Sequence, residues 1–200
     1  RLIRWNTTLL RDPQGSLVGI SSVGEDITEH SWAEQLQEVV NEISQGTITC
    51  QTVGDLYVLI HHSLEQLMQV NNFFISFYDE ETQKLTFPYY IDQFDDPPEP
   101  QPLGRGLTEY VLRTGQPLLA SPEVFTELIE RGEVEEIGTP CVDWLGVPLK
   151  NGGTTIGVMV VQSYTAGPRF SQRDLHVLDF VSTQIALTIE RKRAEQALRD

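Results

Sequence analysis

The chain has 200 residues, of which 40% are hydrophobic and 22% are charged, a composition that suits one full domain with a small appendage. The formal net charge of -15 argues against binding to nucleic acid or to an anionic membrane, because both need clustered Lys and Arg. No apolar run approaches the ~20 residues that cross a bilayer. The two cysteines form no disulfide framework, so we expect a cytoplasmic protein.

The first residues predict a hairpin. Residues 2–10 alternate as a strand does, residues 11–15 supply a turn, and residues 17–23 form a second strand. An isolated hairpin is marginally stable in water. We therefore expect these strands to pack on the rest of the chain or on a partner, or to be the edge of a sheet whose other strands are absent.

A helix should follow the hairpin. Asp26 and Glu29 have the spacing of a capping box, so the helix should begin near Ile27, and Gly46 should end it. Its apolar residues lie four, three and four positions apart, which is typical of a helix that pairs with another. These residues are Trp32, Leu36, Val39 and Ile43.

The middle of the chain predicts a helix over 55–68 and a hairpin of strands 73–78 and 85–91. Pro88 lacks an N–H group, so the ladder should be irregular there and at least one of the two tyrosines that follow should point to the loop above the sheet. That loop, residues 92–102, is rich in proline and acidic residues and suits a binding edge.

The last hundred residues predict further helices and strands. We expect a short helix over 107–112, a strand over 117–120 and a helix from Pro122 to Arg131. Strands over 144–149 and 155–164 should form a hairpin, with the second strand central because it is apolar on both faces. A helix over 171–198 carries an apolar stripe, composed of Leu175, Leu178, Val181, Ile185 and Ile189.

This order of elements resembles the GAF domain family. The residue strings that carry the resemblance are NFFISFYDE, LTFPYYID, LGRGLTEYVLRTGQPLL, DWLGVPLK, IGVMVVQSY and IERKRAEQAL. It implies an α+β fold, in which an antiparallel sheet of five to six strands has the terminal helices on one face and a pocket roofed by loops and short helices on the other.

The resemblance also implies a division of the chain. Residues 1–26, with the exit Asp26-Ile27-Thr28, resemble the C-terminal hairpin of a PAS domain; residues 27–46 form a linker helix, 47–190 the GAF domain, and 191–200 the start of a signalling helix. With no initiator Met, the chain looks excised from a longer bacterial sensor, whose output domain is a histidine kinase or a diguanylate cyclase.

A homodimer through the terminal helices is a further expectation from the resemblance. The residues expected to form it are Trp32, Leu36, Val39 and Ile43 in the first helix, and Leu178, Val181, Ile185 and Ile189 in the last. The partners expected are thus a second copy, an unknown small-molecule ligand and the missing output domain, with no nucleic acid and no membrane.

Aromatic and cationic residues suggest where a ligand binds. Trp144 and the aromatics near Pro88 suit an apolar cavity, although the same residues would serve as ordinary core. Arg105 and Arg113 suit a clamp for a carboxylate or phosphate, unless they pair with the acids of the 92–99 loop. The candidate ligand-binding residues are Tyr89, Tyr90, Arg105, Thr108, Tyr110, Arg113, Cys141 and Trp144.

No cofactor follows from the sequence. Cys141 precedes Val142 and lacks the Cys-His pair of GAF domains that attach a bilin, so we expect no covalent chromophore and an inert thiol. The four histidines, including His61 and His62, have no metal-ligand spacing, and we expect no metal. The signature of cyclic-nucleotide-binding GAF domains is absent, and those that reduce free methionine sulfoxide need more than two cysteines.

The sequence therefore predicts a non-catalytic sensory module that binds a small ligand and relays its state through dimeric helices. The alternative is a ligand-free dimerisation and spacer module that transmits a signal from an upstream PAS domain. An enzyme is disfavoured because no set of nucleophile, base and orienting group is evident.

Overall fold

The computed structural model describes residues 1–165, 167 and 169–198, and the chain divides into two compact units, Arg1–Glu38 and Val39–Asp200. The first unit holds a two-stranded antiparallel sheet of β1 (Ile3–Arg11) and β2 (Leu17–Asp26), in which Ile3 lies opposite Asp26. The predicted hairpin is therefore present as a sheet of its own. The finer division of the chain at residues 26, 46 and 190 stays a prediction.

Helix α1 (Thr28–Thr49) begins where the sequence predicts but ends later. At its start the Asp26 carboxylate accepts bonds from the Thr28 hydroxyl and amide, at 2.6 and 3.1 Å, and together with a bond from the Arg1 guanidinium these lower the pKa of Asp26 to about 2. The helix does not stop at Gly46. A Cβ atom there would lie 2.6 Å from Leu56 Cδ1, so this glycine permits close packing between helices and does not act as a terminator.

The second unit is built on a six-stranded antiparallel sheet with the order β5-β4-β3-β8-β7-β6. The strands are β3 (Asn72–Asp79), β4 (Lys84–Ile91), β5 (Gln101–Pro102), β6 (Leu118–Ala120), β7 (Asp143–Asn151) and β8 (Thr154–Ser163). β8 lies in the middle, as its sequence predicts, and the four side chains from Val158 to Val161 are fully buried. Only the two-residue strand β5 was not predicted.

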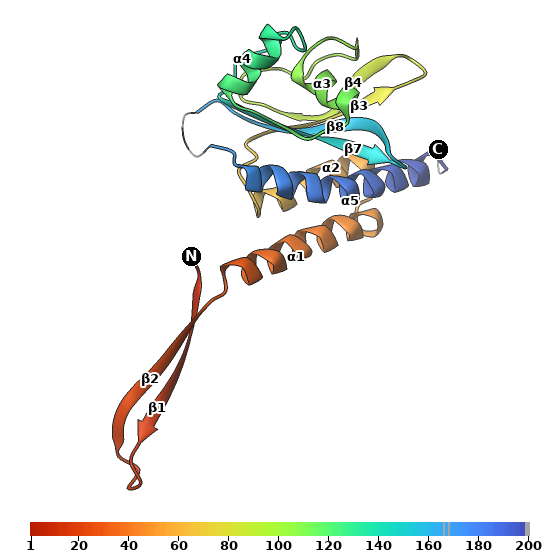
Figure 1. Ribbon diagram of the computed structural model, residues 1–200. Coiled ribbons are helices and arrows are strands. Elements are labelled where there is room, and N and C mark those ends of the chain that lie inside the picture. The colour runs from red at the N-terminus through yellow and green to blue at the C-terminus, as the bar shows by residue number, and fades with distance from the viewer. Residues whose placement is uncertain (166, 168, 199–200) are drawn as a thin grey trace. The chain divides into compact units, whose positions relative to one another are not determined.

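Helices cover both faces of this sheet (Figure 1). α2 (Val53–Glu65) and α5 (Gln172–Ala197) lie on one face, and α3 (Leu107–Thr114) and α4 (Pro122–Glu130) lie on the other. The predicted α+β fold is confirmed. Both α2 and α5 begin with a reciprocal capping box, Thr52 with Asp55 and Ser171 with Asp174. The predicted helix over 55–68 is shifted to 53–65 because the Thr52 cap starts it two residues earlier.

Six of the eight apolar residues predicted to contact a second copy are buried within the second unit and face its own core, while the homodimer itself stays a prediction. The side chains of Val39, Ile43, Leu178, Val181, Ile185 and Ile189 are each 0% exposed. A helical period marks the buried face of a helix whether it packs on its own sheet or on another chain. The large apolar side chains of α5 that are exposed are Phe180 and Leu187, and Leu198, which directly follows the helix, is exposed too. Trp32 and Leu36 belong to the other unit.

Two further observations concern the C-terminal residues and the lengths of the helices. Residues 199 and 200 of the predicted signalling segment lie outside the described residues, and α5 ends at Ala197. Among the helices described, none combines the length and the apolar content needed to cross a membrane.

Candidate functional site

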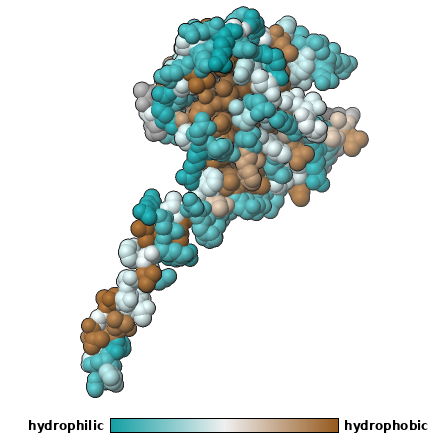
Figure 2. Space-filling model, in the orientation of Figure 1, coloured by the Kyte–Doolittle hydropathy of each residue, from teal (hydrophilic) through white to brown (hydrophobic). Residues whose placement is uncertain are grey.

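A cavity of about 340 Å³ lies on the sheet face that carries α3 and α4. Its volume falls in the range of small-molecule sites. Strands β3, β4, β7 and β8 form its floor, while the first turns of α3 and α4 and the loops over 95–101 and 135–141 surround it. Figure 2 shows apolar surface in the upper part of the domain, bordered by polar residues.

Three aromatic rings from β3 and β4 form one part of the floor. The Phe74 ring stacks on Tyr90 with centroids 5.2 Å apart and meets Phe87 at 5.9 Å. Residues 87 and 90 would face opposite sides of a regular strand. The register shifts between Ile75 and Phe77, opposite Pro88, and this irregularity brings both rings to the cavity face. The proline predicted the irregular ladder and one tyrosine on this side, but not that Phe87 would share the face with Tyr90.

Trp144, on β7, forms another part of the floor, and its position depends on Gly146. Both residues lie on the same face of the strand, two positions apart. A Cβ atom on Gly146 would lie 2.2 Å from the Trp144 ring. The indole therefore covers its own strand, and it is only 5% exposed.

Asp95 joins two loops at the rim of the cavity. Its carboxylate accepts bonds from the Thr139 amide at 3.0 Å and from the Thr139 hydroxyl at 2.7 Å. These bonds connect the acidic loop after β4 to the loop before β7, two segments 44 residues apart. Of the second loop, only Cys141 was predicted to be part of the site.

Glu109, in the first turn of α3, is a buried carboxylate that lines the cavity. It is 6% exposed, and one of its oxygens accepts a bond of 3.2 Å from the Gly104 amide. A Cβ atom on Gly106 would lie 2.9 Å from the other oxygen, so the turn around Arg105 wraps closely around the carboxylate. In the described part of the chain, no cation forms a salt bridge with Glu109.

The electrostatic environment of the cavity is negative. Burial raises the pKa of Tyr90 to about 12 and the pKa of Cys141 to about 11, and for both groups the charges of Asp92 and Asp95 add to the effect. The pKa of Tyr164 is also raised, first by burial and then by its bond to Asp92. Anionic forms are disfavoured at all three groups, which come from three separate segments.

The predicted arginine clamp is not in the cavity. Arg105 contacts Glu135, with 3.7 Å between Nη1 and Oε1, and also the Gly132 carbonyl. Arg113 pairs with Glu133 at 3.2 Å. The sequence also allowed that both arginines pair with acids of the 92–99 loop. They do pair with acids, but these acids lie in the loop after α4. Among the described residues that line the cavity there is no Lys or Arg.

Two of the predicted tyrosines also lie elsewhere. Tyr89 points to the opposite face of the sheet, where its hydroxyl lies 2.9 Å from His61 Nδ1. The other ring nitrogen of His61 lies 2.8 Å from the Val70 carbonyl oxygen, which can only accept, so Nε2 carries the hydrogen and Nδ1 accepts from Tyr89 in the neutral ring. Tyr110 lies beneath the Arg113 guanidinium, 5.5 Å from its ring centroid, outside the cavity.

The predicted site residues therefore divide evenly. Tyr90, Thr108, Cys141 and Trp144 line the cavity, whereas Tyr89, Arg105, Tyr110 and Arg113 do not. Sequence reasoning missed Phe74 and Glu109 as lining residues. Alternation along β3 places the side chain of residue 74 on one face of the sheet and those of residues 73 and 75 on the other, but nothing in the sequence shows which face the cavity occupies.

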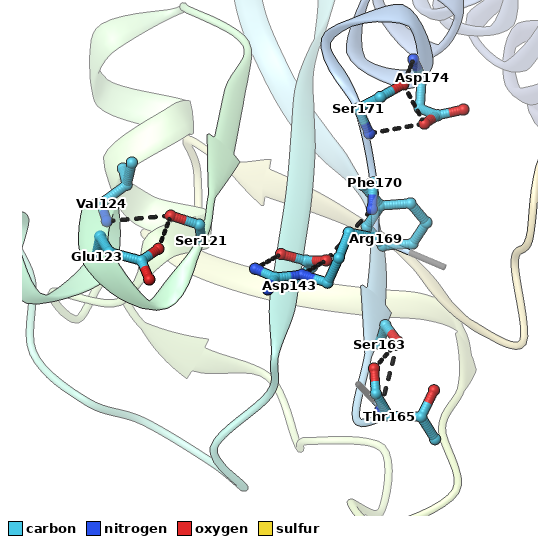
Figure 3. A network of polar contacts seen from close by, with 10 residues as sticks. All are labelled: Ser121, Glu123, Val124, Asp143, Ser163, Thr165, Arg169, Phe170, Ser171 and Asp174. Carbon is cyan, nitrogen blue, oxygen red and sulfur yellow. Dashed lines mark hydrogen bonds and ion pairs between the residues drawn. The ribbon is translucent and has the colours of Figure 1, made fainter. Parts of the chain in front are cut away.

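A polar network connects the cavity floor to the start of α5 (Figure 3). Asp143 directly precedes Trp144, is 2% exposed, and accepts two bonds from the Arg169 guanidinium, at 2.5 and 2.6 Å. The Phe170 amide donates a third bond at 3.2 Å. Ser171, the next residue, caps α5. The hydrogen bonds from Arg169 to the Asp143 carboxylate raise the pKa of the arginine, so its guanidinium stays protonated.

The comparisons with known proteins agree with this fold. The family model for the GAF domain matches residues 50–190, and the chain therefore belongs to the GAF domain family. A comparison with curated proteins finds no match.

Solved structures similar to this chain share its fold at low sequence identity. The GAF domain of an Acinetobacter phosphoenolpyruvate-protein phosphotransferase has a TM-score of 0.60 and 19% identity, over 82% of this chain and 95% of that one. Free methionine-R-sulfoxide reductase from Neisseria meningitidis, with its substrate, has a TM-score of 0.62 and 15% identity, over 80% and 91%. A methyl-accepting chemotaxis protein has a TM-score of 0.59 and 16% identity, over 78% and 99%.

Proposed function

We propose that this chain is a non-catalytic sensory module of a cytoplasmic bacterial signalling protein. A small molecule binds in the cavity and changes the position of α5, which passes the change to an output domain of the histidine kinase or diguanylate cyclase type. Residues 1–26 belong to a preceding PAS domain. One of the similar structures is a chemotaxis protein, which is a signalling context.

The observation that carries this proposal is the adjacency of Asp143 and Trp144 on β7. Trp144 lines the cavity, and Asp143 holds Arg169 and Phe170 immediately before the cap of α5. A ligand that moves the indole acts on a strand end to which the start of the helix is fixed. Such a ligand shifts the helix only if it binds one arrangement more tightly than the other.

We propose that the module acts as a homodimer through exposed residues of α5. Phe180 is 61% exposed and Leu187 is 50% exposed, and they lie seven positions apart on the same side of the helix. These residues replace the buried stripe as the proposed contact with the second copy. A change in the tilt of α5 would then alter how the two copies pair.

Ligand binding in the cavity would distinguish the sensory module from the ligand-free spacer. Native mass spectrometry of the purified chain should show a bound small molecule or, after incubation with a metabolite library, a mass shift. The Ala120→Leu variant is the matched control, because Ala120 lines the cavity and the larger side chain fills part of it. Binding that persists in this variant at unchanged affinity, or no binding by any compound, would favour the spacer.

The effect on α5 is tested by hydrogen exchange with a compound identified in that way. Amides of residues 172–178 should change their protection on binding in the wild type and not in Asp143→Ala. A ligand that binds tightly and leaves α5 exchange unchanged would contradict the relay.

A further inference from the structure

The cavity combines aromatic faces with carboxylates and contains no cationic side chain among its described lining residues. Phe74, Phe87, Tyr90 and Trp144 present rings to it, and Phe125 of α4 lines the opposite wall. The electron-rich faces of aromatic rings attract cations, most strongly where water is excluded. Five carboxylates line the same cavity, namely Asp95, Asp96, Glu109, Glu135 and Glu136.

From this combination we infer that the ligand is a small organic cation, with its ammonium group among the aromatic rings and the Glu109 carboxylate as its counter-charge. The inference rests on the proposed function, since it names the class of molecule that the sensory cavity takes. A negative net charge alone would not carry it, because acids cover this protein. The buried position of Glu109 and the aromatic floor make the cavity different from the rest of the surface.

Glu109 differs from the other lining acids in its burial. Asp95 is half-buried and Asp96, Glu135 and Glu136 are exposed, whereas Glu109 is 6% exposed and, among the described residues, accepts one hydrogen bond, from the Gly104 amide. An ionised carboxylate can accept several bonds, and a buried one without a cation is costly. The arrangement is therefore completed by a positive group that comes from outside the chain.

A structural role for Glu109 is the competing explanation. A carboxylate in the first turn of a helix interacts favourably with the helix dipole, and here it also bonds to the turn before α3. A glutamine would keep the hydrogen bond to Gly104 because its amide oxygen accepts equally well. The Glu109→Gln variant thus removes the charge and keeps the bond.

Two other ligand classes fit less well. An anionic ligand would meet the negative charge of Asp92 and Asp95, which adds to burial in raising the pKa values of Tyr90 and Cys141, and the described lining residues include no arginine to offset it. A metal ion needs three or more ligands in one place, and no group of three His, Cys, Asp or Glu residues in the described chain is arranged to hold one. Aromatic walls favour an organic cation over both.

The test is isothermal titration of the purified chain with four probes. Tetramethylammonium and choline are the cations, the carbon isostere of choline is the neutral control of the same shape, and pivalate is the anion. We expect choline to bind about tenfold or more tightly than its neutral isostere, because the isostere loses the attraction to the rings and to Glu109. Pivalate should not bind.

Variants assign the effect to the cavity. Glu109→Gln should weaken choline binding about tenfold and leave the neutral isostere unchanged, and Glu80→Gln, an exposed acid outside the cavity, should leave both unchanged. Tyr90→Leu should bind choline about fivefold more weakly than the wild type, and Tyr90→Phe, which keeps the aromatic face, should bind it more tightly than Tyr90→Leu does. Melting temperatures identify any variant that fails to fold.

The outcomes separate this inference from the proposed function. Binding of the neutral isostere or pivalate as tightly as choline would overturn the cationic class and leave a small-molecule sensor standing. Equal binding of choline to the wild type and to both Glu109→Gln and Tyr90→Leu would overturn the assigned contacts. Binding by none of the four probes would also overturn the inference, whereas the library experiment with Ala120→Leu tests the sensor independently.

Discussion

Lys192 Nζ donates a hydrogen bond of 3.1 Å to the backbone carbonyl oxygen of Thr47, which fixes the end of α5 to the end of α1. The lysine is 2% exposed, and its ammonium group also contacts Glu195 at 3.1 Å. A buried lysine is unusual in proteins and is tolerated where it is paired. The two helices that would carry a signal into and out of the domain are thus joined by one polar contact.

Replacing Lys192 by Met should weaken this junction. Met has a similar length but cannot donate, so the Thr47 carbonyl loses its partner, at a cost of about 1 to 2 kcal/mol. Amide exchange at the end of α1 should rise and the denaturant midpoint should fall. Arg191→Met, at the exposed neighbouring position, is the matched control. Equal exchange in the two variants would show that the lysine does not hold the helices together.

The Asp143–Arg169 pair should control the start of α5. Asp143→Asn removes the charge that holds Arg169, and we expect a loss of about 1 to 2 kcal/mol, limited because the arginine is half-exposed. Faster exchange in residues 172–176, with exchange elsewhere in the sheet unchanged, is the expected signature. Glu127→Gln breaks an exposed pair with Arg131 and should have little effect. A uniform loss of protection over the whole domain would argue against a local role.

Replacement by Phe should destabilise the protein more at Tyr89 than at Tyr90. Tyr89→Phe removes the donor to His61 Nδ1 and should lower the free energy of unfolding by about 1 kcal/mol. Tyr90→Phe should change it by less than about half of that amount, because no hydrogen bond of Tyr90 is present in the described structure. Chemical denaturation of the two variants measures the difference. Equal destabilisation would mean that the two rings do not occupy opposite faces as the structure has them.

Alkylation of Cys141 should be slow at neutral pH. Its pKa is raised to about 11, so at pH 8 only ~0.1% of the thiol is thiolate, the reactive form. In a Cys50→Ser background, the rate of reaction with iodoacetamide should rise about tenfold between pH 8 and pH 9. The same chain in urea, where burial is lost, should react much faster at pH 8. Similar rates in the folded and unfolded chain would contradict a buried, protonated thiol.

Gly146→Ala tests what positions the tryptophan. The added methyl group overlaps the present place of the Trp144 ring, so the indole should move toward solvent. In a background with Trp5 and Trp32 replaced by Phe, the emission of Trp144 should shift to longer wavelength. Gly152→Ala, where a Cβ atom would have no other heavy atom within 4 Å, should leave the emission unchanged. An unchanged spectrum in Gly146→Ala would show that the ring and the strand are not in close contact.

Most of the fold could be predicted from local chemistry. The turn residues before Leu17 and the pair Gly152-Gly153 predict two hairpins, and the apolar character of β8 predicts its central place in the sheet. Gly46 was wrongly predicted to end α1 because glycine terminates helices and also permits close helix packing. Only the neighbouring helix, which sequence periodicity does not reveal, distinguishes the two uses.

The site could be predicted only in part. Pro88 correctly indicated an irregular strand, but the partners of Arg105 and Arg113 depend on the path of the loop after α4, which no local pattern determines. The stripe from Leu178 to Ile189 has the same period whether it packs on its own sheet or on another copy. The charge of the cavity depends on segments far apart in sequence, so it emerges only when they are brought together.

The relation between Gly146 and Trp144 has a consequence for how ligand selectivity can change. One hydrogen atom, the side chain of residue 146, leaves room for an indole to lie flat against the strand. Any heavier residue would tilt that ring and resize the chamber without altering a single charged group. The dimensions of this cavity and its charge are therefore encoded at separate positions, and mutation can adjust each while the other is kept.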